Sequence, residues 1–246
     1  MSLIIRSAQT VKNGVTLRGN NTQYIEPSIV LPILFEFDAS VYSSGTTLLD
    51  QSGNDRHATI HGSPAWESDG GGCFVFNANS SKYIEVEGSS GGYGLTYSPA
   101  QASFSVWLKL TSTGYYQHVA GWRGGINFWF LILSGTTLTE ARFDNGPVYD
   151  IGIDYSPYLN TWSQATFVVD AANNRTKLYV NGIEVGSTIG ASGNFGGPSS
   201  NFTLGGVVTD SFPFNGKIGG STAYSKALTD AEIVSEFNRT KTRYGL

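Results

Sequence analysis

Two short stretches of sequence decide the fold. Residues 162–170 read WSQATFVVD, and residues 177–186 read KLYVNGIEVG. Both are rich in β-branched and aromatic residues, which favour strands. Asn181 and Gly182 interrupt the second stretch, and an Asn-Gly pair supplies the positive φ angles that a type I′ hairpin turn needs. The two stretches therefore predict antiparallel strands joined by tight turns.

The same pattern continues on both sides of these stretches. Residues 104–110 read FSVWLKL, and Gly, Asn, Ser and Pro clusters separate such runs at the intervals of about 8–12 residues that are typical of a β-sandwich. One helix is also indicated, because Thr229 and Glu232 have the spacing of a capping box. Ile233 and Phe237 follow at helical spacing on one face. We expect an all-β sandwich with one short C-terminal helix.

Composition excludes several classes of protein. The 246 residues include 31 Gly and are 40% hydrophobic but only 14% charged, which is typical of a folded, turn-rich chain. A net charge of −4 gives no field to hold polyanions, so neither nucleic acid nor a membrane is an expected partner. Cys73 is the single cysteine, and no export signal or run of about 20 apolar residues is present. These features favour assembly in a cytoplasm over secretion.

The N-terminal residues differ from the rest of the chain. Residues 10–17 have the pattern of a small hairpin, which is marginal in water unless it packs on something else. We interpret residues 1–30 as an N-terminal β arm or small extension and residues 31–246 as the sandwich domain. The alternative, an edge strand added to the same sandwich, stays open. The apolar residues of the arm that are expected to make an assembly contact are Leu3, Ile4, Ile5, Val11, Val15 and Leu17.

From residue 34 to the C-terminus the chain resembles the laminin-G-like domains of the concanavalin A-like lectin/glucanase superfamily. The resemblance implies a jelly-roll β-sandwich. It is carried, in order, by residues 48–59 (LLDQSGNDRHAT), 74–77 (FVFN) with 82–86 (KYIEV), 104–109, 162–186, and 214–218 (FNGKI) with 224–233 (YSKALTDAEI).

A narrower resemblance lies at the two ends of this domain. Residues 37–40 (FDAS), residues 44–47 (SGTT) and residues 237–246 (FNRTKTRYGL) are similar to laminin-G-like domains in structural proteins of tailed bacteriophages. This implies a capsid decoration, cement or fibre component on the virion surface, assembled in the host cytoplasm. Its partners would be major capsid or fibre proteins, and analogy with decoration proteins suggests a homo-oligomer, a trimer. We interpret the basic residues 239–244 as a solvated tail.

No catalytic residue is expected. A glycosidase needs two carboxylates flanking the scissile bond, and the nearest candidates are Glu36 with Asp38 and Glu85 with Glu87. Neither pair continues to a third alternating acid, so we interpret them as solvated acids at strand edges. The chain also lacks the nucleophile-elbow, zinc-helix and phosphate-loop motifs. We therefore expect a protein that is not an enzyme.

Calcium is the cofactor that the superfamily resemblance implies. Asp50, Asn54 and Asp55 lie in a loop whose oxygens suit this ion. Relatives often carry an acidic pair where this chain has Gly219 and Gly220, which removes ligands. The alternative is a turn in which Asp50 and Asn54 bond their own backbone. Both interpretations stay open, and no other cofactor is expected.

A glycan is the ligand that such a fold would hold on aromatic faces beside a few polar groups. The candidate glycan-binding residues in or near predicted loops are Tyr115, Tyr116, Trp122, Arg123 and Tyr149. The alternative for each of them is a place in the core. A carbohydrate-binding lectin module for host-receptor or glycan recognition is therefore the second functional hypothesis.

Overall fold

The structure, a computed structural model, describes residues 31–79, 81–86, 101–111, 116–122, 128–134, 137–139, 151–189, 201–206 and 212–246. The arm predicted over residues 1–30 lies outside these ranges. In the described part, no helix is long and apolar enough to cross a membrane.

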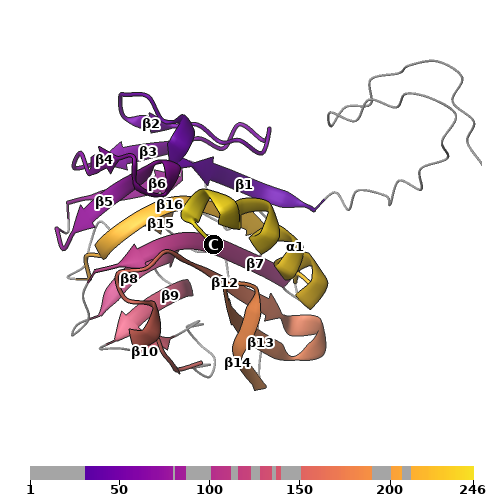
Figure 1. Cartoon of the computed structure of the whole chain (residues 1–246). Helices are drawn as coiled ribbons and strands as arrows, with labels where there is room; N and C mark the ends of the chain where they lie inside the picture. Colours follow the sequence, from indigo (N-terminus) through magenta and orange to yellow (C-terminus); the bar gives the residue numbers. More distant parts are fainter. Residues whose placement is uncertain are drawn as a thin grey trace, which may run out of the picture. The chain divides into compact units, whose positions relative to one another are not determined.

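Two antiparallel sheets form a sandwich, as the alternation of short strands and turns predicts (Figure 1). In the described residues each sheet has eight strands. The first sheet has the order β14 (Ile183–Ile189), β13 (Arg175–Val180), β12 (Ser163–Asp170), β7 (Gln101–Leu110), β16 (Asn215–Tyr224), β5 (Cys73–Asn77) and β4 (Ala65–Glu67), and β1 (Ile33–Asp38) also pairs with β16. The second sheet has the order β11 (Ile153–Asp154), β10 (Thr137–Thr139), β9 (Phe128–Ser134), β8 (Gln117–Trp122), β15 (Phe202–Leu204), β6 (Tyr83–Val86), β3 (Ala58–His61) and β2 (Thr47–Leu48).

The decisive stretches form three neighbouring strands of the first sheet. β12 pairs with β13 so that Phe167 lies opposite Leu178, and β13 turns into β14 at Asn181 and Gly182. These two residues have φ angles of 52° and 80°, which confirms the predicted turn. Asn181 has a second role, because its Oδ1 accepts a hydrogen bond from the Gln164 backbone N–H at 2.9 Å. The turn is thereby tied to β12.

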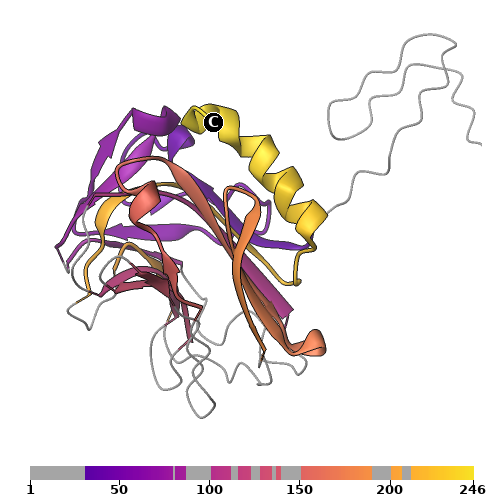
Figure 2. The same cartoon turned by 60° about the horizontal axis from the view of Figure 1, so that its bottom comes forward.

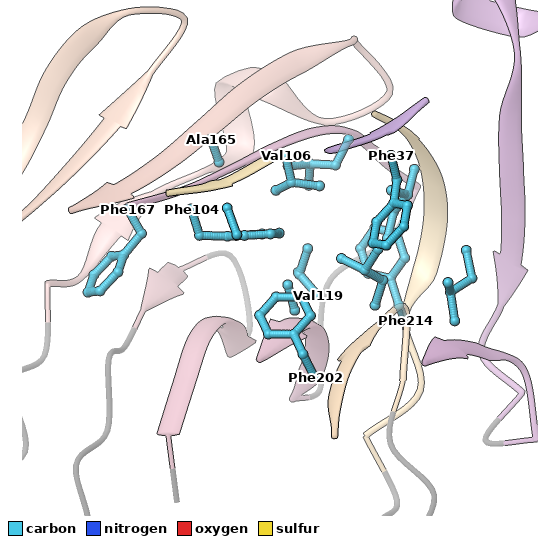
Figure 3. Packing of buried hydrophobic residues seen from close by; sticks show 14 of the residues in the cluster. Phe37, Phe104, Val106, Val119, Ala165, Phe167, Phe202 and Phe214 are labelled. Carbon is cyan, nitrogen blue, oxygen red and sulfur yellow. The ribbon is translucent and has the colours of Figure 1, made fainter. Parts of the chain in front are cut away.

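The core fills the space between the two sheets, where alternate residues of facing strands meet (Figure 3). Phe104 and Phe167 point inward from the first sheet, and Phe202 points toward them from the second. The Phe104 and Phe202 rings lie 5.0 Å apart. All three side chains are buried. Burial on this scale, about 25 cal/mol per Å² of apolar surface, is what holds the layers together.

The helix α1 (Asp230–Thr240) lies across the outer face of the first sheet (Figure 2). Its predicted capping box is present, because Thr229 Oγ1 accepts from the Glu232 N–H and the Glu232 carboxylate accepts from the Thr229 N–H. Phe237 faces the sheet and stacks on Trp107 at 5.8 Å. The described residues also include the 3₁₀ turns η1 (Ala39–Val41), η2 (Asp69–Gly71), η4 (Ser156–Tyr158), η5 (Ala171–Asn173) and η6 (Lys241–Tyr244).

The C-terminal residues are part of the fold, so the interpretation of residues 239–244 as a solvated tail is wrong. The Tyr244 ring stacks on Trp107 at 4.0 Å and lies 4.9 Å from the Trp162 ring. Arg243 pairs with the Asp38 carboxylate of β1, and Arg239 pairs with Glu36 at 3.0 Å. Charge alone could not reveal this, because the partners lie about 200 residues away in sequence. We call residues 239–244 the C-terminal clasp.

Candidate functional site

The outer face of the second sheet carries a polar cluster on neighbouring strands. Ile60, Ile84 and Val86 are buried in the core. Because successive side chains of a strand alternate between its two faces, the intervening residues point outward. The resulting polar face consists of Thr59 and His61 on β3, Tyr83 and Glu85 on β6, and Asn201 and Thr203 at β15.

Glu85 lies at the centre of this polar face. Its Oε2 lies 3.0 Å from His61 Nε2, and its Oε1 accepts a hydrogen bond of 3.1 Å from Asn201 Nδ2. A carboxylate has about four acceptor positions, so these two contacts with described residues leave positions for a ligand. The Glu85 side chain is 21% exposed and that of His61 is 33% exposed. The hydrogen bond from Asn201 therefore orients the carboxylate, which is still accessible.

An aromatic stack lies beside this carboxylate. The His61 and Tyr83 rings are 4.3 Å apart and inclined by only 12°. Burial and the neighbouring charge of Glu85 raise the pKa of Tyr83 above its ordinary value of 10.0, so its phenol stays neutral at physiological pH. Tyr83 is only 9% exposed, so the accessible ring of the stack is that of His61. A ring surface next to a fixed acceptor is an arrangement that suits a polyhydroxylated ligand.

The two carboxylate pairs considered for catalysis are only partly described. Glu36 and Asp38 lie on β1 of the first sheet, and each pairs with an arginine of the C-terminal clasp. Glu85 lies on β6 of the second sheet, and Glu87 lies outside the described residues. A glycosidase needs its two carboxylates on either side of one scissile bond. Glu36 and Asp38 are instead engaged in ion pairs with the C-terminal clasp.

The predicted glycan-binding residues are only partly described. Tyr116 is half exposed and meets the Phe212 ring edge-on, with 5.8 Å between centroids. Trp122 ends β8, where its backbone lies opposite Phe202. The other three predictions, Tyr115, Arg123 and Tyr149, lie outside the described residues. Whether the five residues form one platform stays a prediction.

The loop proposed for calcium is a closed turn. Asp50 Oδ1 accepts from the backbone N–H groups of Glu36 and Ser52, both at 2.9 Å. Its Oδ2 accepts from Ser52 Oγ at 2.7 Å and from the Arg56 N–H at 3.1 Å. Burial acts to raise the pKa of the Asp50 carboxyl, but these hydrogen bonds outweigh it and lower the pKa. All the acceptor positions of this carboxylate are thus used.

This turn covers the free edge of β1. Asn54 Nδ2 donates to the carbonyl of Ile33 at 2.8 Å, and Arg56 Nη1 donates to that of Leu34 at 3.1 Å. Asp55 is exposed, with a φ of 56°. The turn interpretation thus describes Asp50, which accepts from the Ser52 N–H within the turn, whereas the Asn54 side chain bonds the backbone of β1 rather than its own. Among the described residues, no group of three or more His, Cys, Asp or Glu is placed to hold a metal ion, and this geometry does not support the calcium prediction.

The Gly219-Gly220 pair has a packing reason. A Cβ on Gly219 would come within 2.6 Å of the Tyr244 hydroxyl, and one on Gly220 within 3.2 Å of the same atom. A side chain at position 219 would collide with Tyr244 of the C-terminal clasp, and one at position 220 would make a tight contact with it. The position of Tyr244 therefore explains why these two positions are glycine.

Sequence reasoning missed the polar face, although part of a signal was present. Alternation places Thr59 with His61, and Tyr83 with Glu85, on one face of each strand. In the sheet, His61 lies opposite Tyr83, and Glu85 lies between Thr59 and Thr203. The sequence alone does not predict these pairings. That register follows from the assembled sheet.

Comparison with known proteins agrees with this architecture. The laminin G family described as the concanavalin A-like lectin/glucanases superfamily matches residues 79–234, more than half of the chain. No curated protein sequence matches the chain.

Solved structures of toxin binding domains are similar in fold. The binding domain of Paraclostridial Mosquitocidal Protein 1 superposes with a TM-score of 0.67 at 16% identity, covering 85% of this chain and 52% of that one. The receptor binding domain of botulinum neurotoxin C/D mosaic serotype gives a TM-score of 0.67 at 17% identity, covering 85% and 51%. The chain thus spans about half the length of these neighbours. On the family match and the two-sheet sandwich, the chain belongs to the concanavalin A-like lectin/glucanase superfamily.

Proposed function

We propose that this chain is a lectin-like binding domain without catalytic activity, and that it recognises a glycan on the polar face of the second sheet. One observation carries the proposal. Glu85 is oriented by contacts from two flanking strands, with His61 at 3.0 Å and Asn201 at 3.1 Å, beside the ring stack of His61 on Tyr83. Preorganised acceptors lose little entropy when a hydroxylated ligand binds.

The structural neighbours lend support of a general kind. The binding domain of botulinum neurotoxin DC has been solved in complex with rat synaptotagmin II, with a TM-score of 0.66 at 16% identity and 85% and 52% coverage. It has also been solved in complex with SialylT. Domains of this fold therefore serve as recognition modules, and we extend that role to this chain.

The test is a glycan-array screen followed by calorimetric titration of the best ligand. Glu85→Gln removes the charge and keeps the shape, so we expect affinity to fall about tenfold or more, since a hydrogen bond to a charged group contributes about 1.5–3 kcal/mol. Glu184→Gln is the matched control, because it makes the same substitution on the first sheet, where Glu184 pairs with Lys177 at 2.8 Å. Absence of binding to any glycan, with and without calcium, would overturn the proposal.

The predicted loop aromatics offer a second location for the same function. Tyr116 is exposed beside Phe212, which is the position expected of a stacking platform. If Tyr116→Ala abolished binding while Glu85→Gln retained it, the ligand would sit at the loops. The opposite result would place it on the polar face.

For the biological setting we propose a virion structural protein, as the resemblance at the two ends of the domain implies. The structure supports treating these ends as one unit. Asp38, from the first resembling segment, pairs with Arg243 from the last, so the two motifs depend on each other. Immunolabelled electron microscopy of phage particles tests the setting, since label on no particle would refute it. Deleting residues 1–30 should leave a folded sandwich that no longer joins particles, and normal incorporation would refute the arm hypothesis.

A further inference from the structure

A small chamber lies between the C-terminal helix and the outer face of the first sheet. Its volume is about 60 Å³. The floor includes the short side chains of Ser105 and Thr222, which lie opposite each other on β7 and β16. Glu236 and Thr240 of α1 lie on the helix side. Because short side chains face a helix here, space remains between the two layers.

Three residues that line this chamber carry a buried polar atom without a partner. Within the described part of the chain, Gln164 Oε1, Ser221 Oγ and the Tyr244 hydroxyl make no hydrogen bond. The three residues are only 4%, 4% and 7% exposed. Buried polar atoms are nearly always hydrogen-bonded, to ordered water where no protein group is available. Three such atoms on residues around one cavity therefore point to an occupant.

The charges around the chamber indicate what the occupant is. Arg239 is paired with Glu36 at 3.0 Å and Glu236 at 2.8 Å, and Arg243 is paired with Asp38. These three carboxylates and two guanidinium groups give the surroundings of the chamber a net negative charge, which disfavours binding of an anion. The guanidinium groups already occupy the acids, and no metal-binding group occurs among the described residues. An uncharged molecule is the remaining class.

The orphan atoms narrow the chemistry further. Gln164 Oε1 only accepts, so the occupant must donate a hydrogen bond, whereas the Tyr244 hydroxyl can donate or accept. A hydroxyl group or a water molecule meets both requirements, but an ether or a carbonyl compound does not. At about 10–15 Å³ per water, a chamber of about 60 Å³ holds about four to six water molecules or one molecule of similar size.

We propose that this chamber is a binding site for small uncharged hydroxylated molecules, either a group of ordered waters or a short polyol, which bridge Gln164 of the sheet to Tyr244 of the C-terminal clasp. The site lies on the sheet opposite to the polar face, and it does not depend on the function proposed there.

Two isosteric variants test the proposal through the sign of their effect on stability. If the chamber is occupied, Tyr244→Phe and Gln164→Met each remove a hydrogen bond, and the folding equilibrium constant should fall about threefold to tenfold. If it is dry, each variant removes a buried unpaired group, and the constant should rise. Thr176→Val is the matched control, because Thr176 Oγ1 is also buried and unpartnered among the described residues but Thr176 does not line the chamber. That variant should not lose stability.

A high-resolution crystal structure of the full chain separates the two sources of ligand. Crystals grown without polyol should show density that bridges Gln164 Oε1 and Tyr244 Oη, and soaking with ethylene glycol shows whether a diol replaces water there. Retained waters assign a hydration site, and exchange assigns a polyol site. An empty chamber, or a gain in stability in either chamber variant, overturns the proposal.

Discussion

Arg243→Ala tests whether the C-terminal clasp holds the fold together. Arg243 Nε donates to the carbonyl of Gly70 at 2.7 Å, and Nη2 donates to that of Gly72 at 2.8 Å. Nη1 pairs with the Asp38 carboxylate. One side chain thus joins β1, the η2 turn and the C-terminus. Truncation leaves all three acceptors without this donor.

The magnitude follows from these three contacts. Hydrogen bonds involving a charged group contribute about 1.5–3 kcal/mol when buried. The Arg243 and Asp38 side chains are 22% and 34% exposed, so we take about 1 kcal/mol for each contact after allowing for solvent screening. The expected loss in the free energy of unfolding is about 3 kcal/mol. For a chain of this length, the melting temperature should fall by about 6–12 °C.

Urea unfolding followed by tryptophan fluorescence is the assay, because Trp107 and Trp162 both contact Tyr244 in the clasp. Lys241→Ala is the control, since Lys241 makes a cation–π contact with Phe237 at 5.3 Å, and it should lose less than about 1 kcal/mol. Arg243→Lys keeps the positive charge but loses the guanidinium group that donates several hydrogen bonds at once. Its loss in the free energy of unfolding should lie between those of Arg243→Ala and Lys241→Ala. If Arg243→Ala and Lys241→Ala both lowered the free energy of unfolding by the same small amount, the C-terminal clasp would be refuted. Residues 239–244 would then be interpreted as a solvated tail.

Three further changes have effects that follow directly from local geometry. The hydrogen bond from Lys217 holds the pKa of Asp69 well below its ordinary value of 3.8. The ionised Asp69 therefore stabilises the fold above about pH 4, and this contribution is lost as the pH falls further. Urea titrations should show a lower free energy of unfolding at pH 3 than at pH 7, and Asp69→Asn should reduce that difference. Gly72→Ala should destabilise by more than about 1 kcal/mol, because its φ is +135° and the new Cβ would lie 2.7 Å from Ser40 Cα; an unchanged urea midpoint would contradict this. Thr229→Ala should cost about 1 kcal/mol through loss of the N-cap of α1, measured as a shift of the urea midpoint at constant slope.

The candidate site shows where inference from sequence stops. Alternation identifies His61 and Glu85 as outward residues of two strands, because side-chain direction is a local property of extended backbone. Their contact needs β3 and β6 to be neighbours in one register. A shift of one residue would turn both side chains to the other face. Asn201 enters the site from β15, more than 100 residues further along the chain, and no short-range pattern predicts that.

The sequence by itself determined the features that depend on neighbouring residues. The positive φ angles at Asn181 and Gly182, the capping box at Thr229 and the alternation that fills the core all arise within a few residues of one another. Such features follow from steric limits on φ and ψ and from side chains that bond their own backbone.

Only the tertiary structure decided which distant groups meet. Asp50 binds the edge of β1 because its carboxylate accepts a hydrogen bond from the Glu36 backbone N–H. Gly219 is small because Tyr244 packs on it, and Arg243 is an internal tie because Asp38 and Gly70 lie within its reach. These contacts depend on sheet order and on the path of the last helix. Both are set by the burial of the whole apolar core, which no single segment encodes.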